Sequence, residues 1–277
     1  MFPFSFFMAK TIFITGSSSG IGKATALYFA RKGWNVAATM RNPDKEKELT
    51  QFSNVLLLPL DVLNQMQISE ALQETIRVFG TIDVLVNNAG YAASGAFELA
   101  TPEQIKKQFD VNVFGLMNMT QAVLPYFRAQ KSGTIINLAS VAGHCGFPGM
   151  SLYNATKFAV EGFSESLQYE LNAFNIKVKV VEPGPIKTDF YSRSMDIISS
   201  KETTVYDNYI NKVTAKMNAM GNKGKNPDSV VKIIFKATIS KSNKLRYPVG
   251  CFERFTIFSG KILPHCLFRF IINKMFR

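Results

Sequence analysis

The stretch that decides the fold reads TIFITGSSSGIG and spans residues 11–22. Its first five residues, Thr11–Thr15, are apolar or β-branched and predict a buried strand, which runs directly into a turn that contains three glycines. Glycine permits a tight turn and a close approach of the backbone to a bound group, and the N–H groups at the start of the next helix attract phosphate. The turn is therefore expected to bind the pyrophosphate of a dinucleotide through Gly16, Ser18, Ser19, Gly20, Ile21 and Gly22.

Short apolar runs alternate with longer helical patterns along the rest of the chain. Strands are expected at Thr11–Thr15, Val36–Met40, Val55–Leu60, Val84–Asn87, Thr134–Leu138, Lys177–Val181 and Leu245–Val249, and helices at Gly20–Lys32, Asn64–Phe79, Pro102–Phe127, Leu152–Phe174 and Asp228–Ile239. Runs such as Val55–Leu60 are apolar throughout, which is typical of parallel strands buried on both faces. The sequence thus predicts an α/β fold, a single Rossmann-type domain with a doubly wound parallel sheet, helices on both faces and a ligand crevice at the carboxyl ends of the strands.

The composition is that of a globular chain without disulfides or a metal site. Of the 277 residues, 47% are hydrophobic and 19% are charged, which excludes a disordered protein. The three cysteines form no CxxC pair and the two histidines lie far apart, so we expect no metal and a reducing compartment. No uninterrupted apolar run reaches the ~18 residues of a membrane span. Residues 1–9 lack the basic start of a signal peptide, so we expect them to be an apolar extension of the domain, with Met8 as an alternative start. We therefore expect a cytoplasmic protein.

The residue after the second strand indicates which cofactor is bound. Folds that prefer NAD usually place an acidic residue there, which accepts hydrogen bonds from the adenine-side ribose. Here residues 38–41 read ATMR, and the first acid is Asp44. The guanidinium of Arg41 can bind a 2′-phosphate through two parallel hydrogen bonds. We therefore expect NADP, with NADPH preferred over NADH; an ordinary surface arginine is the alternative.

Four residues in the middle of the chain form a candidate catalytic group. Asn112 lies inside a long helix pattern, and Ser140 ends the fifth expected strand. Tyr153 and Lys157 follow in the segment YNATK and face the same way, because four residues are about one helical turn. A free tyrosine has a pKa of about 10, and a nearby ammonium is expected to lower that pKa toward the working pH. Tyr153 could then exchange a proton with a substrate oxygen while hydride moves to carbon.

Taken together, these motifs resemble the short-chain dehydrogenase/reductase family. The match runs from Lys10 to Thr188 and contains TGSSSGIG, NNAG at residues 87–90 and the four candidate catalytic positions in order. The resemblance implies that Tyr153 is the general acid/base and that Ser140 hydrogen-bonds the substrate oxygen. It also implies that Asn112 holds a relay water and that Lys157 binds the nicotinamide ribose. Further cofactor contacts are implied for Asp61, Val62, Asn88, Gly90, Asn112, Tyr153, Lys157, Pro183, Gly184, Ile186 and Thr188.

A looser resemblance, in the segments ATMR and RYPVG, points to the branch that contains hydroxysteroid and retinol dehydrogenases. It implies an apolar small-molecule substrate, such as a steroid, retinoid or other lipid-like alcohol or ketone, and the family implies a homodimer or homotetramer. The residues between Ser140 and Tyr153 that would line the substrate pocket are His144, Cys145, Phe147 and Met150. For His144 a hydrogen-bonded loop histidine is the alternative. The alternative function is a redox sensor that binds NADP(H) without turnover.

Positive charge is concentrated in the last third of the chain. The net charge is +12, and residues 191–277 hold sixteen Lys and Arg against five Asp and Glu. No nucleic-acid recognition motif accompanies this charge, so no nucleic acid is expected as a partner. We divide the chain into a catalytic domain at 10–250, with a polar substrate lid at 190–225, and a basic amphipathic tail at 251–277. The tail could contact a membrane surface, cover the substrate mouth or join two subunits.

Overall fold

The strands of the central sheet are short, apolar and parallel. The structure is a computed structural model, which describes residues 9–200 and 204–276. Seven strands pair in the order β3-β2-β1-β4-β6-β7-β9, and each is parallel to its neighbours. They are β1 (Thr11–Ile14), β2 (Asn35–Met40), β3 (Val55–Pro59), β4 (Val84–Asn87), β6 (Gly133–Leu138), β7 (Ile176–Glu182) and β9 (Arg246–Pro248). The strand order reverses between β1 and β4, so the predicted doubly wound parallel sheet is confirmed.

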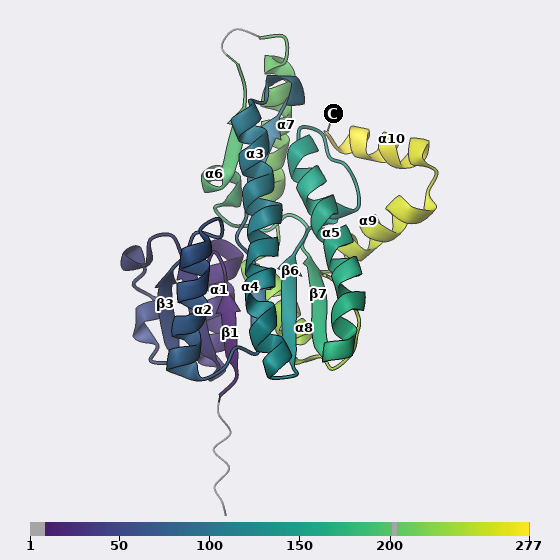
Figure 1. Cartoon of the computed structure of the whole chain (residues 1–277). Coiled ribbons are helices and arrows are strands. Elements are labelled where there is room, and N and C mark those ends of the chain that lie inside the picture. The colour runs from purple at the N-terminus through teal and green to yellow at the C-terminus, as the bar shows by residue number, and fades with distance from the viewer. Residues whose placement is uncertain (1–8, 201–203, 277) are drawn as a thin grey trace, which may run out of the picture.

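Helices cover both faces of this sheet. On one face lie α1 (Gly20–Arg31) and α8 (Pro227–Ile239), and on the other lie α2 (Gln65–Phe79), α4 (Gly115–Ala129) and α5 (Ser151–Leu171) (Figure 1). Successive residues of β1 point to opposite faces: Ile12 and Ile14 pack in the same core cluster as Phe29 of α1. Phe13, between them, packs in the cluster that contains Phe127 of α4. Burial on both faces explains why strands such as β1 and β4 show no alternation of apolar and polar residues.

The long helix expected at Pro102–Phe127 is interrupted. It consists of α3 (Pro102–Phe109), a π-helical turn η4 (Asp110–Phe114) and α4. A π-turn adds a residue to one turn of a helix and hardly disturbs its apolar periodicity, so the sequence pattern does not reveal it. The helix expected at Leu152–Phe174 ends earlier, because the chain tightens after Leu171 and Asn175 adopts a left-handed conformation with φ of 56°. Short 3-10 turns are η1 (Pro43–Lys45), η2 (Leu49–Gln51), η3 (Phe97–Leu99), η5 (Val141–Gly143) and η6 (Asn172–Phe174).

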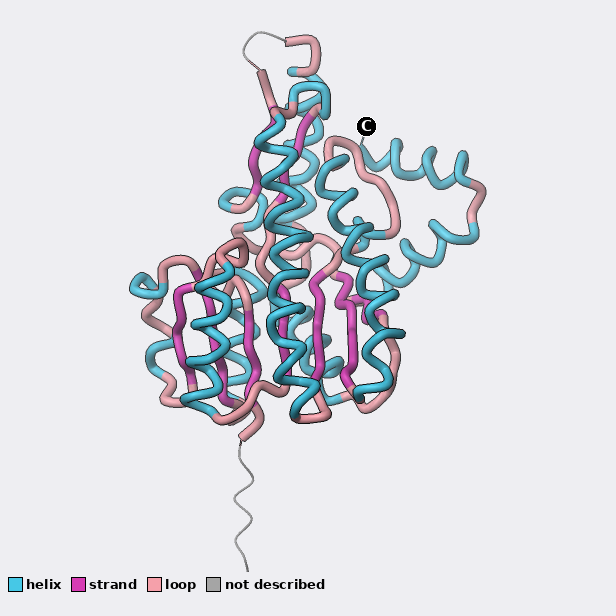
Figure 2. Tube along the Cα trace, viewed as in Figure 1, coloured by secondary structure: helices cyan, strands magenta, loops and turns pink. Residues whose placement is uncertain are grey.

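A second layer stands above the carboxyl ends of the central strands (Figure 2). It contains a two-stranded parallel sheet of β5 (Ala92–Gly95) and β8 (Met195–Ile198), with α6 (Phe190–Arg193), α7 (Asp207–Asn222), α9 (Cys251–Ile262) and α10 (His265–Phe276). The segment 190–225, expected to be irregular, therefore contains two helices and a strand in its described part. No helix among the described residues is long and apolar enough to cross a membrane.

Candidate active site

A cavity of about 650 Å³ opens above the carboxyl ends of the central strands. The loops that follow six of those strands line its lower part, and α5, α6, α7, α9 and α10 line its upper part. All of the predicted catalytic and cofactor-binding residues line it except Gly22 and Asn112. Those that do are Gly16, Ser18, Ser19, Gly20, Ile21, Arg41, Asp61, Val62, Asn88, Gly90, Ser140, Tyr153, Lys157, Pro183, Gly184, Ile186 and Thr188.

The glycine turn after β1 has the shape that close approach to a ligand requires. Gly16 has a φ of 70°, and a Cβ at this position would lie 2.9 Å from the Cα of Ala89. A Cβ at Gly22 would lie 2.4 Å from the carbonyl oxygen of Gly16, which explains why Gly22 supports the turn from behind without lining the cavity. The cap of α1, Ser19, makes no side-chain hydrogen bond to the helix. The first turn of α1 therefore lacks an internal side-chain cap, and it fits a phosphate group.

Asn88 holds the same turn in place from the loop after β4. Its side-chain Nδ2 donates hydrogen bonds to the carbonyl oxygens of Thr15 at 2.9 Å and Gly16 at 3.0 Å. In return, the hydroxyl of Thr15 accepts hydrogen bonds from the backbone N–H groups of Asn88 and Ala89, both at 3.0 Å. The two loops that would enclose the pyrophosphate are thus joined to each other by side-chain hydrogen bonds.

Three of the predicted cofactor-binding residues line the end of the cavity beyond β2 and β3. Arg41, immediately after β2, is exposed and forms no ion pair with any described residue. Asp61 accepts a hydrogen bond from the backbone N–H of Leu63 at 3.0 Å, which fixes the loop after β3. Val62 is buried against Gly115 at the start of α4. Because Arg41 has no carboxylate partner there, its guanidinium is free to bind an anion.

Ser140 joins the loop after β6 to the loop after β7. Its hydroxyl donates to the carbonyl oxygen of Pro183 at 3.3 Å and accepts from the backbone N–H of Ala142 at 3.1 Å. The backbone N–H of Val141 donates to the same carbonyl oxygen of Pro183 at 3.1 Å. The segment from Pro183 to Thr188, which was expected to contact the cofactor, therefore begins beside Ser140.

Tyr153 and Lys157 lie one turn apart on α5 and face the cavity together. The Nζ of Lys157 is 5.5 Å from the ring centroid of Tyr153, and it donates a hydrogen bond to the carbonyl oxygen of Leu138 at 2.7 Å. Burial raises the pKa of Tyr153, the neighbouring Tyr191 adds to the rise, and a hydrogen bond with Ser140 opposes it. Burial also lowers the pKa of Lys157 to about 8, although the charge of Glu161 opposes this shift.

The expectation that Lys157 lowers the pKa of Tyr153 is therefore wrong for this structure, in which the pKa of Tyr153 is raised. The ammonium of Lys157 lies over the ring of Tyr153 and donates its hydrogen bond to Leu138. Burial removes water from the phenolate of Tyr153, and this cost outweighs any attraction between the phenolate and the ammonium. In this arrangement Tyr153 is a protonated phenol at neutral pH, and it can act as a proton donor.

Asn112 lies in the π-helical turn and is almost fully buried. Its Nδ2 donates to the carbonyl oxygen of Tyr91 at 2.8 Å and to the hydroxyl of Thr156 at 3.2 Å. Its Oδ1 accepts from the backbone N–H of Tyr91 at 3.0 Å. The side-chain amide is thus occupied by these bonds and does not reach the cavity. The amide connects the loop after β4 to α5. The role of Asn112 in holding a relay water stays a prediction, and its side-chain amide is not available for that water because its hydrogen bonds are already made within the protein.

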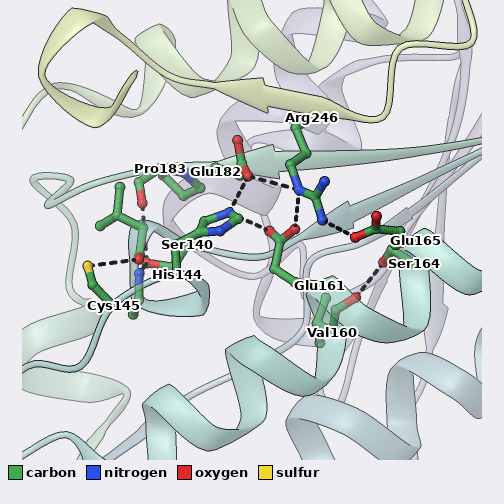
Figure 3. A network of polar contacts seen from close by, with 12 residues as sticks. Ser140, His144, Cys145, Val160, Glu161, Ser164, Glu165, Glu182, Pro183 and Arg246 are labelled. Carbon is green, nitrogen blue, oxygen red and sulfur yellow. Dashed lines mark hydrogen bonds and ion pairs between the residues drawn. The ribbon is translucent and has the colours of Figure 1, made fainter. Parts of the chain in front are cut away.

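A buried charge network that the sequence analysis missed lies behind Ser140 (Figure 3). His144 Nε2 is 2.6 Å from a carboxylate oxygen of Glu182 and 3.5 Å from one of Glu161. Arg246 pairs with Glu161 at 2.9 Å and with Glu165 at 2.6 Å. Burial opposes a charge on His144, but hydrogen bonds and charges from Glu161 and Glu182 more than offset it and raise the pKa of His144 to about 9. His144 is therefore the hydrogen-bonded loop histidine of the alternative, and it carries a charge.

The substrate half of the cavity is largely apolar. Phe147 and Met150 line it as expected, whereas His144 and Cys145 do not, since His144 turns toward Glu182 and the thiol of Cys145 is buried against Val141. Further apolar residues complete the wall: Phe190, Tyr191, Met217, Met220, Phe252, Phe255, Leu263, Phe268, Ile271, Ile272 and Phe276. They lie within the segments 190–225 and 251–277, for which the sequence suggested a substrate lid and an amphipathic tail.

Comparisons with known proteins agree with this geometry. Residues 10–196 match the family model for short chain dehydrogenase. The chain is 34% identical to the uncharacterized oxidoreductase YusZ of Bacillus subtilis over 96% of this chain and 98% of that one. It is 40% identical to a 3-ketodihydrosphingosine reductase of Bacteroides thetaiotaomicron over 73% of each chain.

Solved structures show the same family resemblance. A short-chain dehydrogenase from Streptomyces avermitilis superposes with a TM-score of 0.82 at 29% identity, over 96% of this chain and 95% of that one. The closed form of serine dehydrogenase complexed with NADP+ superposes with a TM-score of 0.72 at 29% identity, over 85% of this chain and 93% of that one. With its glycine turn, its Ser140, Tyr153 and Lys157 at one cavity and these relatives, the chain belongs to the short-chain dehydrogenase/reductase family, the NAD(P)-dependent oxidoreductases that act on CH–OH groups.

Proposed function

We propose that this protein is an NADPH-dependent reductase that converts an apolar, lipid-like carbonyl compound into the alcohol. The observation that carries the proposal is the continuity of the cavity, which extends from the glycine turn, past Tyr153, into a chamber walled by aromatic and aliphatic side chains. A nicotinamide bound at the lower end would face the substrate held at the upper end.

The side chains around Tyr153 support proton donation to a substrate oxygen. The cofactor, when bound, supplies the hydride. Ser140 would hydrogen-bond the carbonyl oxygen, and Tyr153 would give that oxygen its proton, which burial favours because it keeps the phenol protonated. Lys157 would release Leu138 or share its Nζ hydrogens with the cofactor ribose, which fixes the orientation of the ring.

The preference for NADPH rests on Arg41. Its guanidinium lines the cavity after β2, where it has no acidic partner among the described residues, and it presents a planar fork that suits a phosphate. An acidic residue that would accept from an unphosphorylated ribose is missing from residues 38–43.

The apolar substrate is supported by the wall of the chamber. Tyr153, Phe190 and Tyr191 form a line of edge-to-face rings, with centroid distances of 6.0 Å and 5.6 Å. Phe147 and Phe276 also line the chamber, and their ring centroids are 6.3 Å apart. Such walls favour steroid, retinoid or acyl-chain surfaces over polar sugars or amino acids, and one relative carries the name of a reductase for a sphingoid ketone.

A homodimer or homotetramer is supported by apolar side chains on the helices that flank the sheet. Phe114 before α4 and Phe158 on α5 are about half exposed, and Tyr169 near the end of α5 is more exposed still. Neighbouring faces of two subunits would bury these side chains.

The test is a substrate screen with purified protein. Ketosteroids, retinaldehydes, long-chain ketones and 3-oxoacyl compounds are offered with NADPH or NADH, and the loss of reduced nicotinamide absorbance is followed. Turnover of at least one apolar carbonyl is expected, and Tyr153→Phe should lower kcat by at least ~10³-fold while cofactor affinity changes by less than about twofold. Tight NADPH binding without turnover of any compound would identify a sensor and refute the proposal.

A further inference from the structure

The helix α9 buries two of its polar residues and exposes three of its large apolar residues. Glu253 and Ser259 are buried, with 2% and 8% of their surface exposed. On the same helix Phe252, Phe255 and Phe258 each expose more than half of their surface. A helix on the surface of a protein in water normally does the reverse, so the outer face of α9 is built for an apolar environment.

The following helix, α10, extends this apolar surface. Three of its side chains bury into the cluster that walls the substrate chamber, namely Phe268, Ile272 and Phe276. Leu267, Phe270 and Ile271 on the same helix are exposed. Together α9 and α10 form what we call the tail hairpin, residues 251–276 (Figure 1), whose exposed large apolar side chains are Phe252, Phe255, Phe258, Ile262, Leu267, Phe270 and Ile271. These leave between 41% and 67% of their surface in solvent, which is a patch rather than isolated residues.

The exposed charged residues in the described part of the hairpin are all cations. Residues 251–277 contain five Lys and Arg and one acid, Glu253. Glu253 is buried and pairs with Lys225 at 2.5 Å, against Gly184, where a Cβ would lie 2.7 Å from a Glu253 carboxylate oxygen. Arg254, Arg269 and Lys274 are exposed. An apolar patch bordered by cations without a competing exposed acid complements the headgroups and acyl chains of an anionic bilayer.

The patch also borders the mouth of the substrate chamber. Phe252, Phe255 and Ile271 are exposed to solvent and line the cavity at the same time. The apolar surface is therefore continuous from the outside of the hairpin to the chamber beside Tyr153. A lipid-like substrate could move along it without crossing water.

We propose that the tail hairpin docks on the surface of an anionic lipid bilayer and takes its substrate from that surface. The inference deepens the proposed function and rests on it for the substrate, but the docking itself does not. A second copy of the chain is the competing occupant of the patch. Protein interfaces exclude charge from their cores and pair it at their rims, whereas here the bordering charges are of one sign and would repel a symmetric partner.

The test uses the full chain and vesicles of phosphatidylcholine with or without phosphatidylglycerol, separated by flotation. The key variant is Phe258→Ser with Phe270→Ser, two exposed residues that do not line the cavity. The matched control is Phe97→Ser, which is equally exposed but lies on η3, outside the hairpin. The wild type and the control should bind the anionic vesicles, less so in high salt, and the double variant should bind at least about tenfold more weakly.

Activity separates docking from chemistry. The double variant should turn over a short water-soluble carbonyl like the wild type, yet lose most of its turnover of a substrate embedded in vesicles. Tyr153→Phe should lose both activities and keep vesicle binding, so a failed proposed function does not imitate a failed docking. Equal vesicle binding by wild type and double variant would overturn the inference. So would the absence of vesicle binding by the wild type, and in that case a drop in subunit number in the double variant would assign the patch to a second copy.

Discussion

Replacement of His144 by glutamine tests the buried charge network that supports the catalytic loop. His144 follows η5, four residues after Ser140, and its side chain is 10% exposed. It faces Glu161 from α5 and Glu182 from the end of β7, and Arg246 from β9 lies on the far side of both carboxylates (Figure 3). Glutamine keeps a hydrogen-bond donor of similar reach but cannot carry a positive charge. The variant thus removes one cation from two buried carboxylates.

The size of the effect follows from the pKa of His144, which rises from 6.5 to about 9 on folding. A raised pKa means that the folded state holds the proton more tightly, so the stabilisation is complete below pH 6.5 and is lost as the pH rises through 9. At about 1.4 kcal/mol for each pKa unit, the full contribution is about 3 kcal/mol, and most of it is lost between about pH 7 and about pH 9.5. Lys157 gives the opposite dependence of stability on pH. Its pKa is lowered to about 8 in the folded protein, so the folded state loses this proton more readily and becomes more stable as the pH rises above 8. Both proteins share that contribution, so it drops out of their difference.

The measurement is urea unfolding of wild type and His144→Gln at several pH values. The wild type should be more stable than the variant at about pH 7, and this advantage should shrink by about 2–3 kcal/mol by about pH 9.5. Full occupancy of the cofactor site is avoided, because a ligand would add its own stabilisation. An advantage that stays constant across this range would refute the claim that His144 is charged in the folded protein.

Two further substitutions test the cofactor end and the second layer. Arg41→Ala should weaken NADPH binding by ~10–100-fold and change NADH affinity by less than about twofold, because only NADPH carries the 2′-phosphate; equal losses in fluorescence titrations would contradict this assignment. Gly95→Ala should lower the free energy of unfolding by more than about 2 kcal/mol, since Gly95 has a φ of 151° and a Cβ would lie 2.2 Å from the carbonyl oxygen of Ile198. Gly146→Ala, where a Cβ meets no atom within 4 Å, is its control, and similar unfolding of the two variants would show that the β5–β8 contact tolerates a side chain.

The central sheet was predictable from the sequence because its signals are local. Strands such as β1, β3 and β4 are largely apolar runs of four or five residues, and the glycine turn gives both the end of β1 and the start of α1. Parallel strands also gather their carboxyl ends at one edge. Residues that follow different strands, such as Arg41, Asn88 and Ser140, were therefore expected at one crevice, and the structure places them around one cavity.

Apart from α10, which lies in the amphipathic tail, the second layer was not predictable because its signals are not local. The strand β5 is four small residues, AASG, whose only regular partner in the described chain is β8, about a hundred residues later. The helix α7 is polar enough to resemble a loop, and α9 reverses the usual apolar pattern. The charge network has the same origin: Glu161, Glu182 and Arg246 are unremarkable singly in sequence and meet only in the fold.

The central sheet positions the cofactor turn and the proton donor, whereas the second layer forms the wall of the substrate chamber. The loops of the central sheet fix the cofactor turn and the proton donor by hydrogen bonds between neighbouring loops, as with Asn88 on the glycine turn and Ser140 on Pro183. The tail hairpin instead packs on the rest through apolar contacts and one buried ion pair, Lys225 with Glu253. Apolar contacts are non-directional and tolerate repacking. The shape of the substrate chamber can therefore change through the hairpin while the groups that move hydride and proton stay where the sheet holds them.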